Sequence, residues 1–304
     1  MNLPSNFFQS KPVDRHLLAI EFNPAQTRLA YFHDNEGELI FGGSAQGPTP
    51  EASYEALSAK PGKITDIILG LPFHDLTDSS TVVRYRRSLP QEKISEDEVK
   101  NALSQVPPIS GGELFFEDLF NAKIDGLPSL EPVERMGEVV ELNYYQAAAS
   151  EQVLKEVKEL VKKFGVTPGM VPTAYAVAKL IAQTAPKGAL TLDIDPTHTE
   201  VSLSSEGHLV GIKSFDIGST DLEMFIPALE TALEEMEYPD LWPEAVYLCG
   251  TSPSFENIRS ALLAYPWTKK VNMMSFPEIS VFHPVSVNLT LPADVGLNAL
   301  SLLG

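Results

Sequence analysis

The fold is decided by a pattern that occurs twice, LLAIEFNPAQTRL at residues 17–29 and ALTLDIDPTHTEV at residues 189–201. Each copy is an apolar run, an acidic residue, a turn built on Asn-Pro or Asp-Pro, and a second run. Glu21 and Asp193 are equivalent positions, and the offset between the copies is constant at 172 residues (193 − 21). Proline suits the turn because it has no N–H to give to a central strand.

Both second runs end at an acidic residue followed by glycine, Glu36-Gly37 in the first copy and Glu206-Gly207 in the second. Such a pair between two strands favours a tight hairpin. Both halves of the chain therefore open with the same three-strand plan, which indicates an internal duplication rather than a short-period repeat. We expect two similar α/β lobes, with their acidic turns facing a cleft.

The composition is that of a folded globular protein large enough for two or more domains, with 304 residues and 43% apolar residues. The net charge is −19, from 41 acidic and 22 basic residues. Nucleic-acid binding needs basic residues to neutralise phosphates, so we expect no nucleic-acid partner. The same acidity argues against direct adsorption to an anionic membrane.

Several kinds of site and segment are excluded by residue usage. The single cysteine, Cys249, allows no internal disulfide and no cysteine-based metal site. The six histidines show no ligand spacing. No apolar run approaches the roughly 18 residues of a membrane span. Residues 1–10 lack the basic charge and apolar core of a signal peptide, so we expect a cytoplasmic protein.

Three motifs follow one another along the chain: EFNPAQTR at residues 21–28, DIDPTHT at residues 193–199 and VYLCGTS at residues 246–252. In this order they resemble the two phosphate turns and the glycine motif of the actin-like ATPase superfamily, and within it the bacterial FtsA/PilM group. The resemblance spans nearly the whole chain. It implies a duplicated, ribonuclease-H-like α/β fold of two lobes.

The residue pattern of the middle of the chain differs from that of the two repeated segments. Residues 82–87 alternate and are locally basic, Ser95 with Glu98 forms a capping box for a helix, and residues 115–124 and 138–148 read as strands. This block resembles the inserted SHS2 (1C) domain of the FtsA/PilM group, which mediates protein contacts.

The resemblance divides the chain into three parts. It implies a first lobe of residues 1–80 with 172–188, an insert of residues 81–171, and a second lobe of residues 189–304. The second lobe is reduced, since only residues 236–243 stand where full members carry a further subdomain and a lysine near the base. The chain also lacks the basic amphipathic anchor that ends FtsA, which favours the PilM side of the group.

A nucleotide cleft would need backbone N–H groups at the phosphates and carboxylates for Mg²⁺. In this role Glu21 and Asp193 would hold the metal, Thr197 and Thr199 would donate to phosphate oxygens, and Arg28 would replace the family lysine. The resemblance places the nucleotide on the following residues: Glu21, Asn23, Thr27, Arg28, Asp193, Asp195, Thr197, Thr199, Gly218, Gly250 and Thr251.

The turns depart from the family at the positions that matter most. Asn23 and Asp195 replace glycines, and Pro24 and Pro196 each remove a donor. A carboxylate about 4 Å from a phosphate charge repels it by roughly 4 kcal/mol at an effective dielectric near 20, which is nearly a thousandfold in affinity. Three interpretations stay open: ordinary Asx-Pro turns, a weak regulatory site for ATP with Mg²⁺, and a true ATPase.

The function that the resemblance favours is a non-catalytic scaffold of PilM type. In that family the protein lies at the inner face of the cell membrane and binds the cytoplasmic peptide of a single-span assembly protein, in a pilus or secretion machine. The basic edge Arg84-Tyr85-Arg86-Arg87 is a candidate surface for an acidic or extended peptide. The alternative for that edge is a strand protected by charge.

Two other functions belong to different classes. An FtsA-like ATP-dependent filament or cell-division protein would bind Mg-ATP and polymerise, and homo-oligomerisation is left open. A small-molecule kinase on the same core is disfavoured by the position of the insert and by the lack of a recognisable substrate-binding set.

Overall fold

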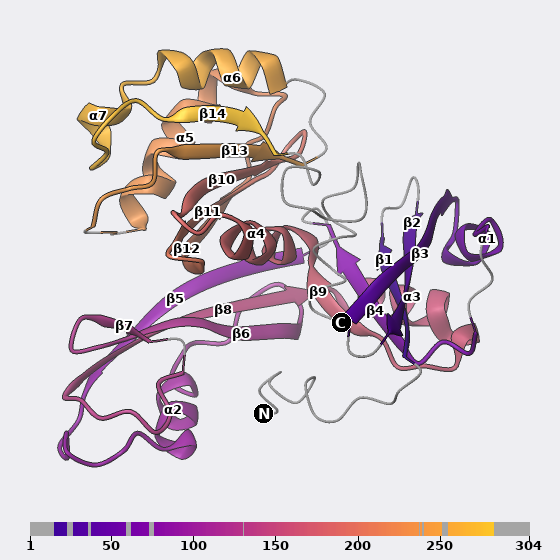
Figure 1. The fold of residues 1–304 in the computed structure, drawn as a ribbon, viewed down its shortest axis with the longest axis horizontal. Coiled ribbons are helices and arrows are strands. Elements are labelled where there is room, and N and C mark those ends of the chain that lie inside the picture. The colour runs from indigo at the N-terminus through magenta and orange to yellow at the C-terminus, as the bar shows by residue number, and fades with distance from the viewer. Residues whose placement is uncertain are drawn as a thin grey trace.

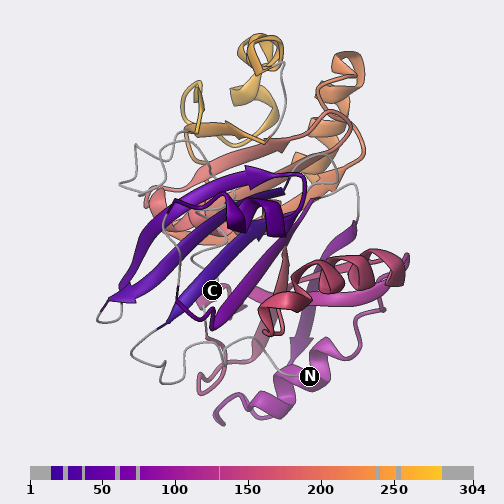
Figure 2. The same cartoon turned by 90° about the vertical axis from the view of Figure 1, so that its right-hand side faces the viewer.

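The computed structural model describes residues 15–22, 27–35, 38–58, 62–72, 76–129, 131–236, 238, 240–250 and 255–282. These residues form two five-stranded sheets and one four-stranded sheet. Figure 1 shows the three sheets around the helix α4 (Thr173–Thr184). The second view places the orange and yellow second lobe above the indigo first sheet, with the magenta strands and the helix α2 (Glu96–Leu103) below it (Figure 2).

The first sheet has the order β3-β2-β1-β4-β9. β1 is antiparallel to β2 and parallel to β4, and Glu21 lies opposite Arg28. The bounds of its strands are β1 (His16–Glu21), β2 (Thr27–Asn35), β3 (Glu38–Gly47), β4 (Asp66–Leu71) and β9 (Gly169–Pro172).

The second sheet repeats this plan with the order β12-β11-β10-β13-β14. Asp193 lies opposite Glu200, which is the register of Glu21 and Arg28 shifted by the offset of the duplication. The predicted duplication is therefore confirmed at the level of strand pairing. The bounds of its strands are β10 (Ala189–Ile194), β11 (Thr199–Ser205), β12 (His208–Phe215), β13 (Ala245–Cys249) and β14 (Glu278–Val281).

The hairpin of the second lobe has the expected turn. Glu206 and Gly207 have φ angles of 51° and 84°, as a primed two-residue turn requires. The equivalent pair Glu36-Gly37 lies outside the described residues.

The third sheet is antiparallel, with the order β5-β8-β6-β7. One face packs on α2 (Glu96–Leu103), which begins where the Ser95 side chain accepts a hydrogen bond from the Glu98 N–H, as the capping box predicts. The bounds of its strands are β5 (Leu76–Arg86), β6 (Glu113–Ile124), β7 (Leu127–Ser129) and β8 (Val139–Ala149).

The helix after the third sheet packs on the first sheet. α3 (Glu151–Val161) and the short helix η3 (Lys162–Phe164) end at Gly165, which has a left-handed φ of 70°. Buried Leu154 and Val157 share a cluster with Leu18 of β1. β9 also pairs with β4. Two elements from the stretch that sequence analysis assigned to the insert, residues 81–171, thus contact the first lobe.

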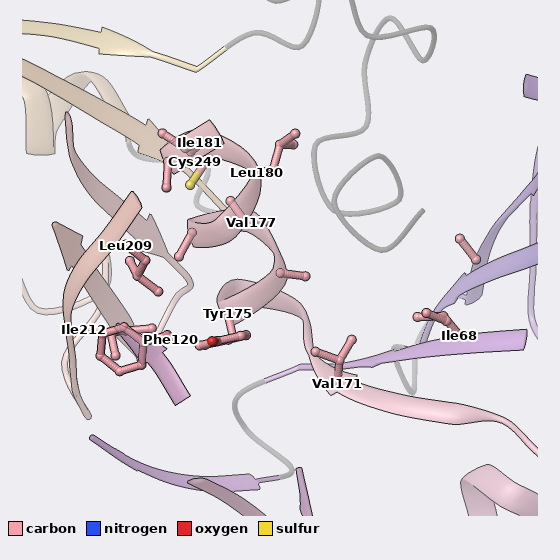
Figure 3. Close-up of a cluster of buried hydrophobic side chains, with 14 of the residues drawn as sticks. Ile68, Phe120, Val171, Tyr175, Val177, Leu180, Ile181, Leu209, Ile212 and Cys249 are labelled. Atoms are coloured by element: carbon pink, nitrogen blue, oxygen red, sulfur yellow. The ribbon is translucent and has the colours of Figure 1, made fainter. Parts of the chain in front are cut away.

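The helix α4 lies at the junction of the three sheets. Figure 3 shows its side chains beside Leu209, Ile212 and Cys249 of the second sheet and beside Phe120 of the third. The Tyr175 hydroxyl donates to Asp118 of β6 at 2.5 Å, and Lys179 pairs with the same carboxylate at 3.1 Å. α4 is therefore bonded to the third sheet as well as packed on the second.

Helices cover the opposite face of the second sheet. Leu190 and Leu192 of β10 share a core cluster with Phe225 of α5 and Ile258 of α6. The other helices of the described residues are α1 (Pro50–Glu55), α5 (Leu222–Glu235), α6 (Phe255–Ala264) and α7 (Trp267–Lys270).

Candidate functional site

The first acidic turn begins with an ion pair inside its own lobe. Arg28 Nη2 lies 2.5 Å from Glu21 Oε2, and the two residues are opposite one another on β1 and β2. Only 12% of the Glu21 side chain is exposed. Thr27 is buried, and Asn23 lies outside the described residues. The positive charge that the resemblance assigns to phosphate is therefore shared with an adjacent carboxylate.

The second acidic turn lies close to the first. Burial, together with the charges of Asp195 and Glu21, raises the pKa of Asp193 to about 8, while Cys249 and Arg28 oppose the change. Glu21 of the first turn therefore lies near enough to Asp193 of the second turn to influence its protonation. At neutral pH the Asp193 carboxyl is mostly protonated, so a metal ion would have to displace this proton.

The hydrogen-bond donors of the second turn bind backbone carbonyls of the same lobe. The Asp195 N–H donates to the His198 carbonyl at 2.9 Å. The Thr199 hydroxyl donates to the Ile217 carbonyl at 2.8 Å, and Thr199 is fully buried. Thr197, by contrast, is exposed.

Gly218 brings a second segment onto this turn. A Cβ atom on Gly218 would lie 2.6 Å from Thr197 N, so only glycine allows this approach. The Ser219 N–H donates to the Asp195 carbonyl and the Thr220 N–H to the Pro196 carbonyl, each at 3.0 Å. The backbone donors that the resemblance would aim at a phosphate are thus used within the protein.

Gly250 also lies too close to its neighbours, here at the end of β10, to leave room for a side chain. Its φ is 102°, and a Cβ atom would lie 2.5 Å from the Ile194 carbonyl oxygen and 2.6 Å from Asp193 Oδ1. Burial and the nearby Asp193 raise the pKa of the Cys249 thiol well above its ordinary value. Thr251 lies outside the described residues.

The two acidic turns offer few ligands for a metal ion. Among the residues that the structure describes, no group of three or more His, Cys, Asp or Glu side chains is arranged to hold one. The two residues that the sequence suggests for Mg²⁺, Glu21 and Asp193, would therefore need ligands from water or from the nucleotide itself.

The basic edge divides into two faces. Arg84 and Arg86 are exposed on the face away from α2 and pair with Glu141 at 3.0 Å and Glu138 at 3.4 Å. Tyr85 points the other way, into the cluster around α2. Its pKa is raised to about 12 by burial and then by Glu98 on that helix.

Arg87 is a structural residue. Its side chain is only 5% exposed and binds Glu98 with two hydrogen bonds of 2.7 and 3.2 Å. It also donates to the carbonyls of Glu92 and Gly137. The four residues that the sequence groups as one partner-binding edge are therefore not brought together on one surface.

The chain matches no protein-family model and no curated protein in sequence. Its structure is similar to that of a PilM-PilN type IV pilus biogenesis complex, with a TM-score of 0.58 and 17% identity over 94% of this chain and 97% of that one. A protein from Bacteroides thetaiotaomicron with an actin-like ATPase fold and unknown function matches with a TM-score of 0.49 and 10% identity over 96% of each chain. The chain has an actin-like fold.

The actin-like lobes enclose a buried polar row that sequence reasoning missed. Glu200, only 1% exposed, lies between Asp193 of β10 and Ser214 of β12 across the second sheet. The Ser214 hydroxyl donates to Asp78 of β5 at 2.8 Å, which links the second lobe to the third sheet. Burial raises the pKa values of both Glu200 and Asp78.

One signal for this row was present in the sequence. β11 reads TEVSLSS, and its alternate residues Glu200, Ser202 and Ser204 are all polar, whereas Val201 and Leu203 are apolar. Alternation of this kind usually marks a solvent-facing side. Here the polar side is buried beneath α4, so it forms an internal polar layer.

The helices in the described parts of the chain are all too short or too polar to cross a membrane.

Proposed function

We propose that this chain is a non-catalytic actin-like scaffold that holds an extended cytoplasmic segment of an inner-membrane assembly protein along β5. The machine would be of the type IV pilus or secretion kind, with the scaffold at the cytoplasmic face of the membrane. The similarity to the fold of a PilM-PilN complex supports this choice among actin-like functions. The third sheet would correspond to an SHS2-like insert in the first lobe, and the second lobe would be the reduced one.

The observation that carries the proposal is the open edge of β5. β5 is the end strand of its sheet and pairs with β8 on one side. Near its start it meets the second lobe, where the Ser80 hydroxyl donates to the Ile212 carbonyl. From Thr81 to Arg86 no other strand of the described residues pairs with its outer side. An unpaired edge of this length is a template for an added strand.

The exposed face of this edge suits an acidic partner. Val82 is 55% exposed, and the Arg84 and Arg86 side chains are 64% and 74% exposed. Their pairs with glutamates of β8 are surface ion pairs, which are worth at most about 1 kcal/mol. Carboxylates of an incoming segment would therefore compete for both guanidinium groups, while Val82 would give an apolar contact.

The absence of nucleotide hydrolysis is part of the proposal. It is supported by the N–H groups of Ser219 and Thr220, which already donate hydrogen bonds to carbonyls of the Asp195-Pro196 turn. It is also supported by Asp195, which stands where a phosphate would need a glycine. The alternative of an FtsA-like switch keeps one observation in its favour, since Glu21 of the first lobe lies near enough to Asp193 of the second lobe to raise its pKa.

The test uses a fluorescent peptide that copies the cytoplasmic N-terminal segment of the PilN-like protein from the same organism. We expect Arg84→Glu with Arg86→Glu to weaken binding by about tenfold or more, because two attractive charges become repulsive. Lys158→Glu in α3 with Lys162→Glu in η3 makes the same charge change at exposed positions and should leave binding within about twofold. Equal losses in both double variants would reject the edge as the binding surface.

The backbone contact can be tested separately. In an added strand, only alternate amides of the peptide face β5. N-methylation of the amides in one alternate set should abolish binding, whereas the other set should be tolerated. If both sets were tolerated, the segment would not be bound as a strand.

A further inference from the structure

The second lobe contains a partly open cavity far from the acidic turns. It has a volume of about 260 Å³ and lies between the end of α5, the segment before β13 and the α6–α7 corner. The residues that determine its chemistry are Glu230, Glu234, Tyr238, Trp242, Tyr265 and Lys270. Its volume is below the roughly 300–1,000 Å³ of small-molecule sites, so it suits a single long side chain.

The aromatic walls are held in place by their neighbours. Tyr238 and Trp242 meet edge to face at 5.9 Å, and Trp242 and Tyr265 are 6% and 4% exposed. Trp267 packs edge to face behind Tyr265 at 4.8 Å. The site is therefore preformed, which lowers the entropic cost of binding.

Backbone and amide hydrogen bonds fix the rim of the cavity. The Trp242 N–H donates to the Asn272 carbonyl at 2.9 Å. The Asn272 side-chain amide donates to the Asp240 carbonyl at 3.3 Å. These two bonds tie the segment before β13 to the segment after α7.

The charges at the cavity are unbalanced. Lys270 Nζ pairs with Glu230 at 2.9 Å, and this ammonium lowers the pKa of Glu230. Glu234, one turn further along α5, forms no ion pair within the described part of the chain. It still acts on Lys270 and Tyr265, because it contributes to the raised pKa values of both. Two carboxylates thus act on one ammonium group in a cavity that is also lined by three aromatic rings.

We propose that this cavity binds the guanidinium group of an arginine side chain from a basic peptide segment of a partner. A guanidinium group satisfies both features of the site, because it pairs with a carboxylate and stacks on aromatic faces. The strongly acidic chain would also attract a basic segment at long range. This second contact lies on the second lobe and does not depend on the β5 edge.

The test exploits the two tryptophans of the chain. Trp242 lines the cavity, and Trp267 is fully buried behind it, so Trp267→Phe leaves one reporter at the site. The probe is acetyl-Gly-Arg-Gly-amide, compared with the same peptide carrying citrulline, which has the same shape without the charge. We expect a saturable change in Trp242 fluorescence with arginine and none with citrulline.

Matched variants separate the site from the general acidity of the chain. Glu234→Gln should weaken binding of the arginine peptide by about fivefold. Glu223→Gln removes the same charge at an exposed position in the first turn of α5 and should leave affinity unchanged. If Trp267→Phe fails to fold, the same titrations are followed by calorimetry in the otherwise unaltered chain. An equal response to citrulline, or unchanged affinity in Glu234→Gln, would overturn the proposal.

Discussion

Gly218 lies so close to the turn at Asp195 that a Cβ atom on Gly218 would sit 2.1 Å from the Asp195 carbonyl oxygen. The resemblance assigns this glycine to a phosphate turn. In the structure it admits a backbone segment that donates two hydrogen bonds to the Asp195-Pro196 turn. The two N–H groups of this segment, which the resemblance would aim at a phosphate, therefore donate to the protein's own carbonyls.

Gly218→Ala should destabilise the second lobe, because the added methyl group must displace backbone atoms. We expect a loss of about 1–3 kcal/mol in the free energy of unfolding, measured by urea denaturation. Gly211→Ala is the control, since a Cβ atom there would meet Met236 at 3.6 Å and Leu203 at 3.9 Å, both ordinary contact distances. Equal stability of the Gly218 variant and the starting protein would show that this close approach does not exist.

Replacing Arg87 should lower the stability of the fold strongly, whereas replacing the adjacent Arg86 should hardly change it. Arg87→Ala leaves Glu98 half-buried without its partner and removes donors from two carbonyls, so we expect a loss of about 3 kcal/mol or more. Arg86→Ala breaks only an exposed pair and should change stability by less than about 0.5 kcal/mol. Thermal and urea unfolding of the two single variants would measure this contrast, and similar losses would contradict it.

The buried carboxyls predict that stability falls as the pH rises. The folded pKa of Asp193, about 8, lies above its ordinary value of 3.8, so between these values the folded state holds a proton that the unfolded state has lost. Over this window, each such proton lowers the free energy of unfolding by up to about 1.4 kcal/mol for every unit by which the pH rises. Glu200 and Asp78 shift in the same direction.

Asp193→Asn removes the contribution of Asp193 to this dependence. We expect the variant to gain stability relative to the starting protein from pH 5 to pH 8, with the difference levelling off above pH 8. Asp97→Asn, on the exposed first turn of α2, serves as the control. A difference that stays constant across this range in urea denaturation would show that Asp193 does not hold a proton in the folded state.

Mg-ATP should give no saturable heat in a calorimetric titration of the purified protein. We expect this because the N–H groups of Ser219 and Thr220 already donate to the carbonyls of the Asp195-Pro196 turn. The negative charge of the Asp195 side chain would also repel a phosphate. Asp195→Gly removes that charge and shows whether it alone excludes the nucleotide. Micromolar binding by the unaltered chain would instead favour the FtsA-like switch, with Asp195 as a metal ligand.

The duplication was predictable from sequence because its signal is local. Strand alternation, the Asx-Pro turn and the acidic-Gly hairpin each constrain a few adjacent residues, and the same register follows in both lobes. The cap at Ser95 and the left-handed Gly165 were predictable for the same reason. β9 was not predicted, because it is a four-residue strand whose pairing partner β4 is distant in the sequence.

The site was less predictable because it depends on which side of an element is covered. The run from Arg84 to Arg87 looked like one basic surface, but strand alternation sends Tyr85 and Arg87 toward α2. Glu200 alternates with apolar residues in a way that is typical of a solvent-facing side, yet α4 covers that side of β11. Gly218 was assigned by resemblance, and its neighbour in space is a turn from another part of the lobe.

The most direct test of the scaffold function is amide hydrogen exchange with and without the PilN-like peptide. We expect new protection at alternate amides of residues 81–86, where an added strand would pair with the outer edge of β5. The acidic turns at Glu21 and Asp193 should exchange unchanged. Protection at those turns, with none along β5, would contradict the proposed mode of binding.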